Sequence, residues 1–528
     1  MTSLVPEPAR PFRLWPFVIV NALAAVWLSL STFQQEQTSD SMIFVLASLY
    51  EWRTFFWEQD RVGMFVPLVV SWCKSPFHNL LLQTGIMAFA GLMLPIMLAR
   101  VLTTNRFAPI AVTIANALFI SFAPCILHEN WMLVCNYPNA LVLGLLALSV
   151  VDVRPTTETW KKRALRMATC GALILLAEWQ YYGMVLFLGP LIVFRTIMKS
   201  GPGAPTRRHG WWRFLFRPLF DPRSLAAVPL LFAALGTIWY VMLEMKELHP
   251  IIAPTSTVSL PMDKWCETWE LMIRTTAELP EMDRYAAWLG GISGVGLLLG
   301  LFVNRRLAWQ MLGAMLPGLL AAAVELLFLG TRWWTTQNSC HPRYLLATTT
   351  MVATATAIIG LVPVLSRIPR RFEPLAVIVA ALCLFGAIAE RYGRPSPAIV
   401  RNILNENCGT LTPVILESKC EAVGAEYWVV WMSMFHVNMT LYERGEDRVV
   451  FGVGPRAEPM KPRWNQYPEG FRVAVPADDF LTVQSGAIYR ELVPLQKIED
   501  RGVFEFPGHH HALPRKMAVG IYKTRSKN

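Results

Sequence analysis

Charged residues are scarce in this sequence of 528 residues. Asp, Glu, Lys and Arg together make up 16% of it, whereas soluble globular proteins average about 25%. Hydrophobic residues reach 54% and aromatic residues 12%, and the apolar residues form a succession of long runs that no single soluble core requires. The composition therefore excludes an ordinary soluble protein and indicates a chain whose main solvent is the bilayer.

Cysteine pairs with metal-binding spacing are also missing. The nine cysteines form no Cys-x-x-Cys pair, and Cys73, Cys170 and Cys383 lie in or beside apolar runs, where a buried thiol is the ordinary state. Cys408 and Cys420 could pair in an oxidising compartment. The sequence lacks an internal repeat, and no small-residue cleavage pattern follows the first apolar run, so we interpret that run as an uncleaved anchor.

Apolar runs of membrane-spanning length predict most of the fold. Nine clear spans are expected at 14–33, 79–101, 108–127, 137–153, 225–244, 286–303, 308–329, 345–366 and 375–391. The run 167–196 is longer than one crossing needs, and its centre "EWQYYG" predicts a turn between two short helices. We expect an α-helical polytopic membrane protein of about 11 spans, with one long kinked helix over 167–196 as the alternative.

The distribution of basic residues supports this count. With the N-terminus in the cytoplasm, the inner segments hold basic clusters at 161–166, 195–223 and 367–371, while the opposite loops before residue 392 hold fewer than half as many basic residues. The positive-inside rule then predicts a multi-pass protein of the inner (plasma) membrane with its C-terminal domain on the extracytoplasmic, periplasmic side. The net charge of +11 is explained by this topology and by attraction to membrane lipids, not by nucleic-acid binding.

Two domains are expected. Residues 1–391 form the transmembrane domain, with interfacial helices in the outer loops 34–78 (over 42–57) and 245–285, where Trp265, Trp269, Met272 and Ile273 form a stripe for membrane contact. Residues 392–528 form a small α/β or β-rich domain. Its strands are predicted at "YWVVWMSMFHVNM", "RVVFGVG", "GFRVAVP", "AIYREL", "VFEFPG" and "MAVGIYK".

Two carboxylates mark the first outer loop. Asp40 follows the first span closely, and Asp60 lies beside Arg61 in "EQDRVG". At the surface of the membrane these carboxylates are candidates for chemistry. They are also explained as solvated loop charges, or as helix N-caps in the case of "TSDS".

A second cluster lies at "TRWWTTQNSCHPRYLL", where the chain enters a late span. Arg332, His341 and Arg343 bring donors to one end of that span, and Tyr344 adds a hydroxyl at headgroup depth. The planar fork of an arginine matches a phosphate, so a lipid phosphate or pyrophosphate is the expected ligand. An interfacial anchor of tryptophan, tyrosine and arginine is the alternative.

Polar residues between closely spaced spans form a third group. His128 and Glu129 lie in "LHENW", and Glu178 and Gln180 lie in "AEWQYYG". Ionisable groups near a membrane core are costly and often functional, although a turn at the surface would leave Glu178 exposed. We assign no metal ligands, because "GHHHAL" has no partner cluster. Two loop carboxylates could still bind a divalent cation such as Mg²⁺ or Mn²⁺.

Taken together, these features resemble the GT-C superfamily of polytopic glycosyltransferases. The resemblance rests on Asp40 after the first span, "EQDRVG" and the expected interfacial helix in the same loop, the short paired spans, "HPRYLL" and the extracytoplasmic C-terminal domain. It implies a hexosyl- or pentosyltransferase that moves a sugar from a polyprenyl-phosphate donor to a hydroxyl of a glycan, lipid or protein, with inversion.

The resemblance also implies roles for the candidate residues. Asp40, or second Asp60, acts as the base. The departing phosphate is stabilised by Arg343, with Arg61, His341 or Arg332 as partners, and positioned by Tyr344. The remaining polar residues, Glu129, His128, Glu178 and Gln180, bind the sugar or the acceptor.

Two other functions stay open. One is a transporter or flippase of lipid-linked glycans, and the other is a non-enzymatic envelope assembly protein that binds through its outer domain. A transporter is expected to place charges near the midplane and to contain related halves. The charged residues here gather at the outer face and the sequence has no repeat, which favours chemistry.

Overall fold

The computed structural model describes residues 12–33, 38–57, 62–132, 136–152, 159–199, 232–240, 243, 259–337, 340–476, 495–506 and 515–524. The chain forms two compact units. The first, here called the helical unit, comprises Met1–Val26, Ala88–Trp131 and Asn136–Gly393. The second, the mixed unit, comprises Trp27–Met87, Met132–Cys135 and Arg394–Asn528. The segment Trp27–Met87 is thus part of the same unit as Arg394–Asn528.

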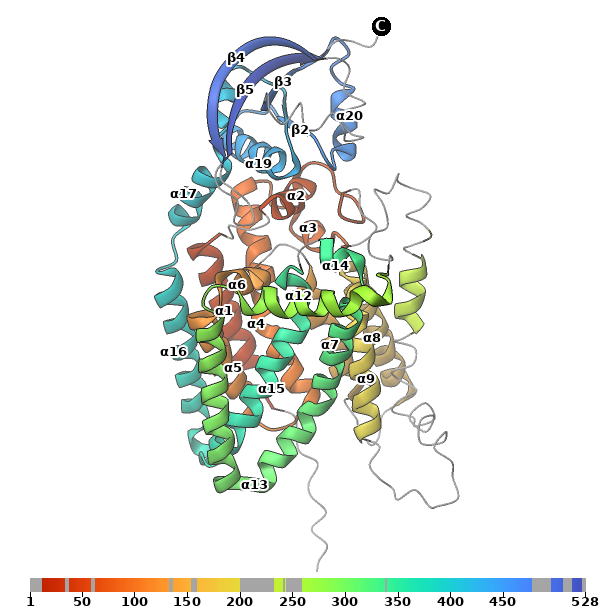
Figure 1. The fold of residues 1–528 in the computed structure, drawn as a ribbon, viewed down its shortest axis with the longest axis vertical. Helices are drawn as coiled ribbons and strands as arrows, with labels where there is room; N and C mark the ends of the chain where they lie inside the picture. The colour runs from red at the N-terminus through yellow and green to blue at the C-terminus, as the bar shows by residue number, and fades with distance from the viewer. Residues whose placement is uncertain are drawn as a thin grey trace, which may run out of the picture. The chain divides into compact units, whose positions relative to one another are not determined.

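The helical unit is built almost wholly from helices (Figure 1). Helices α1, α4 and α6 begin in one unit and end in the other. The helices are α1 (Trp15–Ser31), α4 (Pro76–Leu102), α5 (Ala108–Phe122), α6 (Cys125–Met132), α7 (Tyr137–Asp152), α8 (Trp160–Gln180), α9 (Val185–Lys199), α12 (Trp265–Ala277), α13 (Met282–Leu329), α14 (Trp333–Gln337), α15 (Leu346–Leu365) and α16 (Glu373–Tyr392). The 3-10 turns are η1 (Tyr182–Met184), η2 (Met262–Lys264), η3 (Pro342–Leu345) and η4 (Arg370–Phe372).

Several of these helices can cross a membrane. Within the described residues, four segments are long and apolar enough: Pro76–Leu102, Met282–Leu329, Pro342–Leu365 and Arg370–Cys408. The pair α8 and α9 adds a fifth if it counts as one span. Large apolar side chains on α16 point away from the protein, where lipid would cover them. The chain is therefore a membrane protein, and the count of 11 spans stays a prediction.

The run 167–196 forms two helices, as predicted. Helix α8 ends at Gln180, the chain turns through η1, and α9 leaves at 114° to α8. The two spans predicted at 286–303 and 308–329 are also two helices, joined without a loop as α13. Their junction is Asn304, whose φ of −155° and ψ of 71° are not helical, and Figure 1 shows the two halves diverging from this bend. Of the span predicted at 225–244, the described part is helical over 232–240.

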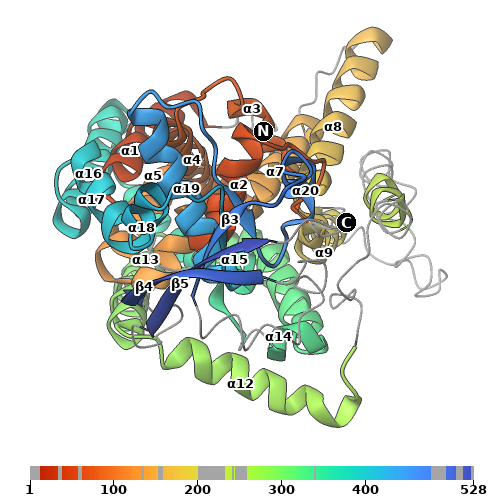
Figure 2. The same cartoon turned by 90° about the horizontal axis from the view of Figure 1, so that it is seen from above.

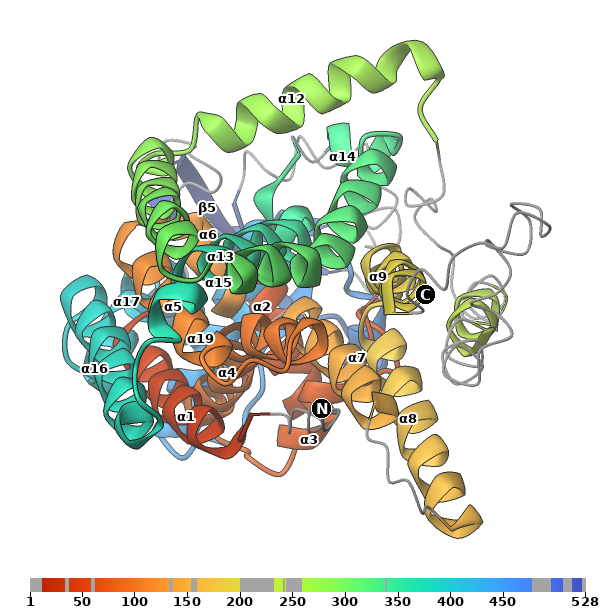
Figure 3. The same ribbon diagram turned by 90° about the horizontal axis from the view of Figure 1, so that it is seen from below.

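The helical unit packs most tightly where α13 meets α15. A Cβ atom on Gly296 would lie 2.7 Å from the carbonyl oxygen of Gly360, and a Cβ on Gly360 would lie 2.8 Å from Cα of Ser293. Only glycine allows two helix backbones to approach this closely. From below, α16 lies beside α5 on the other side of the unit (Figure 3).

The mixed unit combines helices with a five-stranded sheet. Its helices are α2 (Thr38–Leu49), α3 (Phe65–Val70), α17 (Pro397–Cys408), α18 (Thr412–Glu417), α19 (Tyr427–Glu443) and α20 (Lys461–Trp464), with the 3-10 turn η5 (Glu458–Met460). Its strands are β1 (Ala422–Gly424), β2 (Phe451–Val453), β3 (Arg472–Pro476), β4 (Leu495–Phe506) and β5 (Arg515–Thr524).

The sheet has the strand order β2-β1-β3-β5-β4. Strand β1 pairs in parallel with β2 and β3, while β5 pairs antiparallel with β3 and β4. The segments "RVVFGVG" and "GFRVAVP" contain β2 and β3, as predicted, and "MAVGIYK" lies within β5. "VFEFPG" includes only the end of β4, which begins eight residues earlier at Leu495. "AIYREL" lies outside the described residues.

The strand predicted at "YWVVWMSMFHVNM" is wrong, because this segment is helix α19. Nearly all of its residues from Val429 to Leu441 are buried. A helix that is buried all round shows no amphipathic period, so its sequence reads like the continuous apolar run of a buried strand. Viewed from above, α19 lies beside α2 (Figure 2).

Helix α2 is shorter than the predicted interfacial helix over 42–57. It ends at Leu49, and the chain continues without helix or strand to a bridge between Phe55 and Gly63. The side chains from Met42 to Ala47 are at most 1% exposed. Protein atoms therefore cover this helix on all faces, and it serves as a core helix of the mixed unit.

The two cysteines considered as a pair, Cys408 and Cys420, are not bonded to each other. Cys408 and Cys420 are both free and buried, and burial raises the pKa of the Cys420 thiol to about 12. The Cys420 thiol therefore stays protonated and unreactive at neutral pH.

Candidate functional site

Asp40 lies in the first turn of α2 and contacts two residues from the far end of the chain. The hydroxyl of Tyr427 donates a hydrogen bond to Oδ1 of Asp40. Nη1 of Arg456 lies 3.7 Å from the same oxygen and donates a hydrogen bond of 3.1 Å to the hydroxyl of Tyr427. All three groups belong to the mixed unit. The side chains of Asp40 and Arg456 are only 15% and 22% exposed, so water weakens their attraction less than at a free surface.

The surroundings hold Arg456 in place. Its guanidinium lies 4.7 Å from the ring centres of both Phe56 and Tyr427, a cation–π arrangement on two faces. Its backbone has a φ of 68°, the left-handed region that residues other than glycine rarely enter. Nε1 of Trp431 donates to the carbonyl oxygen of Pro455, the preceding residue, at 3.0 Å.

Sequence reasoning found Asp40 but missed Tyr427 and Arg456. Tyr427 begins the segment predicted as a strand, and Arg456 lies in "GVGPRAEP", a run in which the sequence analysis names no motif. Asp40 and Tyr427 are 387 positions apart, so no local spacing could have linked them. Asp60 and Arg61 lie outside the described residues.

The segment "HPRYLL" forms a compact polar turn in the helical unit. His341 precedes the 3-10 turn η3, and its Nδ1 accepts a hydrogen bond of 3.2 Å from the backbone N–H of Arg343. Nη2 of Arg343 donates to the hydroxyl of Tyr344 at 2.9 Å, and the guanidinium lies 4.9 Å from the same ring. Pro342 at the first position of η3 fixes the backbone for this turn. The structure thus brings together His341, Arg343 and Tyr344, three of the four residues that the sequence analysis groups in this cluster.

Helix α12 packs over this turn and was predicted as a membrane-contact helix. Met272 of α12 is 4% exposed and joins a buried cluster with Leu329, Cys340, Tyr344 and Leu345, against which Trp269 also packs. Ile273 is 71% exposed. The predicted stripe is therefore divided, because Met272 is buried and Trp269 partly buried against protein, whereas Ile273 is exposed. Figure 1 shows α12 running across the view, and from above it lies along the edge of the helical unit, near α13 and α14 (Figure 2).

Arg332 is engaged elsewhere. Its guanidinium lies 3.8 Å from the ring centre of Phe328, and Nη1 donates a hydrogen bond of 3.2 Å to Oγ of Ser259. The backbones of Arg332 and Ser259 form an isolated antiparallel bridge. Arg332 therefore ties the segment before α12 to the end of α13.

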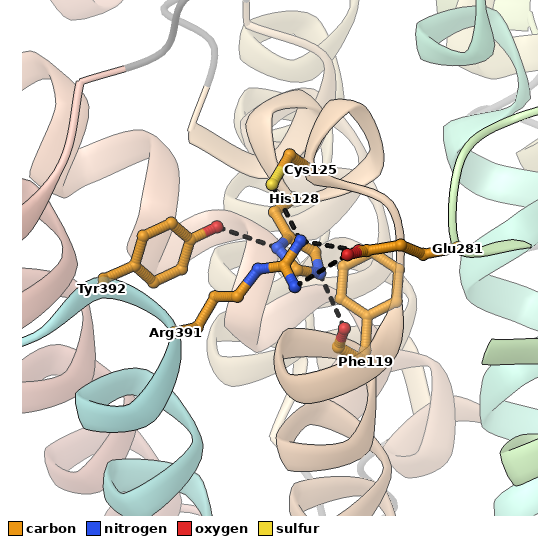
Figure 4. Close-up of polar contacts among 6 residues, drawn as sticks. All are labelled: Phe119, Cys125, His128, Glu281, Arg391 and Tyr392. Atoms are coloured by element: carbon orange, nitrogen blue, oxygen red, sulfur yellow. Dashed lines mark hydrogen bonds and ion pairs between the residues drawn. The ribbon is translucent and has the colours of Figure 1, made fainter. Parts of the chain in front are cut away.

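His128 is enclosed by a polar network (Figure 4). Its Nε2 lies 2.7 Å from the carbonyl oxygen of Phe119, and its Nδ1 lies 2.8 Å from the hydroxyl of Tyr392. Burial lowers the pKa of His128 to about 4, so the ring is neutral at pH 7. Since both ring nitrogens are hydrogen-bonded within the protein, the predicted contact of His128 with substrate would first have to break one of these bonds.

An ion pair adjoins this network. Arg391 places Nη2 2.7 Å from Oε2 of Glu281 and 2.8 Å from Sγ of Cys125, as Figure 4 shows. The hydrogen bond from Arg391 holds the pKa of the Glu281 carboxyl below its usual value. These contacts tie the end of α16 to α6 and to the start of α13. They give the cluster a structural role.

The remaining predicted residues lie on α6 and α8. Glu129 is helical, but its side chain is outside the described part of the structure. Glu178 and Gln180 are both buried, and Oε1 of Gln180 accepts from Nδ2 of Asn139 at 2.5 Å. Glu178 lines a small cavity whose other described lining residues are apolar or glycine. Neither residue is at the surface, where a turn between two spans would have placed it.

No candidate metal centre is found in the part of the chain that the structure describes. In these residues no three His, Cys, Asp or Glu side chains come together in a group that could hold an ion. The divalent cation considered from the two loop carboxylates stays a prediction, since Asp60 lies outside the described ranges.

Comparison with known proteins gives matches at the level of structure. No protein-family model and no curated protein matches the chain. The crystal structure of ArnT from Cupriavidus metallidurans bound to undecaprenyl phosphate is similar to it, with a TM-score of 0.50 and 13% identity over 96% of this chain and 97% of that one.

Two further solved structures match more weakly. ArnT in the apo state has a TM-score of 0.36 and 13% identity over 96% of this chain and 97% of that one. An Archaeoglobus fulgidus oligosaccharyltransferase in complex with Zn and sulfate has a TM-score of 0.36 and 11% identity, over 95% of this chain and 72% of that one. At these scores only the first match supports an argument.

Proposed function

Because the chain shares the GT-C fold of ArnT, as its sequence predicted, we propose that it is a membrane glycosyltransferase. It transfers a sugar from a polyprenyl-phosphate donor to a hydroxyl group on the extracytoplasmic face. The observation that carries this proposal is the match over 96% of the chain to a protein crystallised with undecaprenyl phosphate. The polar turn of His341, Arg343 and Tyr344 supports it, since a guanidinium beside a phenol suits a lipid phosphate.

The reaction uses one base and one phosphate site. The carboxylate of Asp40 takes the proton from the acceptor hydroxyl while that oxygen forms a bond to the anomeric carbon. The bond between the anomeric carbon and the phosphate oxygen breaks, and the polyprenyl phosphate leaves with the electron pair. Arg343, with Tyr344, stabilises the charge that develops on the departing phosphate. Displacement from the opposite face inverts the anomeric centre.

The location and the substrates follow from the same proposal. The N-terminus lies in the cytoplasm of a cell with an inner membrane, and the C-terminal segment lies outside it. The acceptor is a glycan, a lipid or a protein of the envelope. The donor sugar is a hexose or a pentose.

Two substitutions test this function directly. Purified protein in nanodiscs is given undecaprenyl-phosphate-linked hexose or pentose, with extracted envelope glycolipids, glycans and proteins as acceptors. We expect Asp40→Asn to lower kcat by about 10²-fold or more, as loss of a general base does. Arg343→Ala is expected to weaken binding of undecaprenyl phosphate by about tenfold or more, since a charge-assisted contact is lost.

Controls separate these effects from damage to the fold. Arg274→Ala removes an exposed arginine of α12 that pairs only with Glu270 among its described ion pairs, and it should leave both measurements unchanged. A parallel assay with EDTA tests the divalent cation. Full transfer by Asp40→Asn and unchanged lipid binding by Arg343→Ala would together contradict the proposal.

A further inference from the structure

Two side chains from the C-terminal part of the mixed unit contact the carboxylate of Asp40, and we infer that Tyr427 and Arg456 are positioning residues for this base. The inference rests on the proposed function, in which Asp40 accepts a proton. It extends that function, because it makes residues after 391 part of the reaction's machinery. In the alternative, the C-terminal segment only binds a partner.

Both residues act on the same oxygen of the carboxylate. Tyr427 donates a hydrogen bond to Oδ1, and Nη1 of Arg456 lies 3.7 Å from it. Fixing one oxygen from two directions fixes the plane of the carboxylate, and with it the direction of Oδ2. A general base needs this, since proton transfer requires the accepting oxygen within hydrogen-bond reach of the acceptor.

Arg456 keeps a backbone conformation that glycine would adopt without strain. Its φ is 68°, and a side chain held in this region is a cost that persists where the surroundings demand that side chain. The loop before it is fixed on both sides. The carbonyl of Pro455 accepts from Trp431, and a Cβ atom on Gly454 would lie 2.6 Å from the carbonyl oxygen of Ala425. The strain therefore indicates that the guanidinium itself is needed.

The guanidinium is held between rings from two of the chain segments that build the mixed unit. Phe56 comes from the first outer loop and Tyr427 from α19, and each ring centre lies 4.7 Å from Cζ of Arg456. The same two segments also contact through Trp57 and Trp431, which pack edge to face with ring centres 5.4 Å apart. Two rings from separate segments thus restrict the arginine to one arrangement beside Asp40, as a supporting shell does for a catalytic group.

Three variants test the inference in the transfer assay described above. Tyr427→Phe removes the hydroxyl and keeps the ring. Arg456→Gly removes the guanidinium and relieves the left-handed backbone, and Arg456→Lys keeps the charge without the planar fork. We expect Tyr427→Phe and Arg456→Gly to lower kcat by about tenfold or more, with KM for the donor within about twofold of wild type. The lysine should restore part of the loss.

Matched controls and thermal unfolding separate positioning from folding. Tyr442→Phe changes an exposed tyrosine of the same helix, and Arg448→Ala changes an arginine that donates to the carbonyl of Cys420. Neither should change kcat. A purely structural role predicts instead that Tyr427→Phe lowers the unfolding midpoint and leaves kcat unchanged, which would overturn the inference. If Arg456→Gly fails to fold, Tyr427→Phe decides, because it removes one atom and no packing.

A double-mutant cycle shows whether Tyr427 acts through Asp40. Single-turnover rates are measured for Asp40→Asn with and without Tyr427→Phe. We expect the tyrosine substitution to have little further effect once the carboxylate is gone, since coupled residues are not additive. An undiminished effect in this background overturns the inference. If Asp40→Asn transfers sugar as wild type does, the mechanism of the proposed function fails, and the inference fails with it. If Asp40→Asn loses transfer while Tyr427→Phe and Arg456→Gly keep the wild-type kcat, the inference is wrong and the proposed function stands.

Discussion

His436 is a buried imidazole at the junction of three helices of the mixed unit. Oγ1 of Thr412 lies 2.7 Å from its Nδ1, and Oδ1 of Asn405 lies 2.9 Å from its Nε2. Burial lowers the pKa of His436 to about 4, assisted by Arg401 and opposed by Glu443. The contacts suit a neutral ring with its proton on Nε2, which joins α17, α18 and α19.

This histidine predicts acid sensitivity of the folded protein. In the unfolded chain the ring takes up a proton below about pH 6.5, whereas in the folded state it does so only near pH 4. The unfolded state therefore binds more protons in this window, and stability is lost as the pH falls from about 6.5 to 4, on the order of 3 kcal/mol. The thermal unfolding midpoint, measured between pH 7 and pH 4, should fall less steeply in His436→Gln.

A second histidine provides the control. His78 is exposed and contacts Ser75, so His78→Gln should leave the pH dependence as it is in wild type. The same slope in His436→Gln and wild type would contradict the prediction.

At the residue scale the sequence indicates one of the three residues of the Asp40 cluster. Two observations select Asp40: it follows the first apolar span closely, and the GT-C resemblance implies an acidic residue at this place. Its partners were out of reach, because Tyr427 and Arg456 become neighbours of Asp40 only when the chain folds. The turn of His341, Arg343 and Tyr344 was found because its residues are adjacent in sequence.

At the scale of elements, the contact between α13 and α15 predicts that two glycine-to-alanine substitutions change the stability in opposite directions. Gly360→Ala places a methyl group 2.8 Å from Cα of Ser293, which must push the helices apart, and overpacking costs about 1–3 kcal/mol. Gly294 lies on α13, next to Ser293, and has open space around its Cβ position. Gly294→Ala should therefore stabilise the helix by up to about 1 kcal/mol. Thermal unfolding in detergent should therefore show a lower midpoint for Gly360→Ala and an unchanged or higher one for Gly294→Ala. Equal midpoints would refute this packing.

Elements were predictable where lipid or turn chemistry sets their length. The positions of α4, α15 and α16 follow from runs of spanning length, and the break between α8 and α9 follows from a polar, aromatic centre. The helix α19 was not predictable, since burial on all sides removes the period on which the distinction from a strand depends.

At the scale of the whole molecule, the predicted topology is open to test by labelling. In a cysteine-free background, Lys162→Cys and Gly445→Cys should react with a membrane-impermeant maleimide from opposite sides of sealed vesicles, because the basic cluster at 161–166 is expected inside. Both sites are exposed in the structure. Labelling of both from one side would contradict the arrangement of 11 spans.

The mixed unit contains residues from both sides of position 391, which affects what a truncation at that position can show. Removing the chain after residue 391 would take away α19, which covers α2, along with Tyr427 and Arg456. Loss of function in such a truncation is expected for an enzyme and for an assembly protein alike. Single substitutions at Asp40 and Arg343 distinguish these two functions, and deletion of the C-terminal segment does not.

The distance in sequence between Asp40 and Tyr427 has a consequence for synthesis. The two residues are 387 positions apart, and at about 5–20 residues per second the ribosome needs roughly 20–80 s to pass from one to the other. During that interval α2 has left the ribosome, but the helix that will cover its apolar side chains does not yet exist. The nascent chain therefore waits with an unfinished core, and this is the interval in which a chaperone has most to protect.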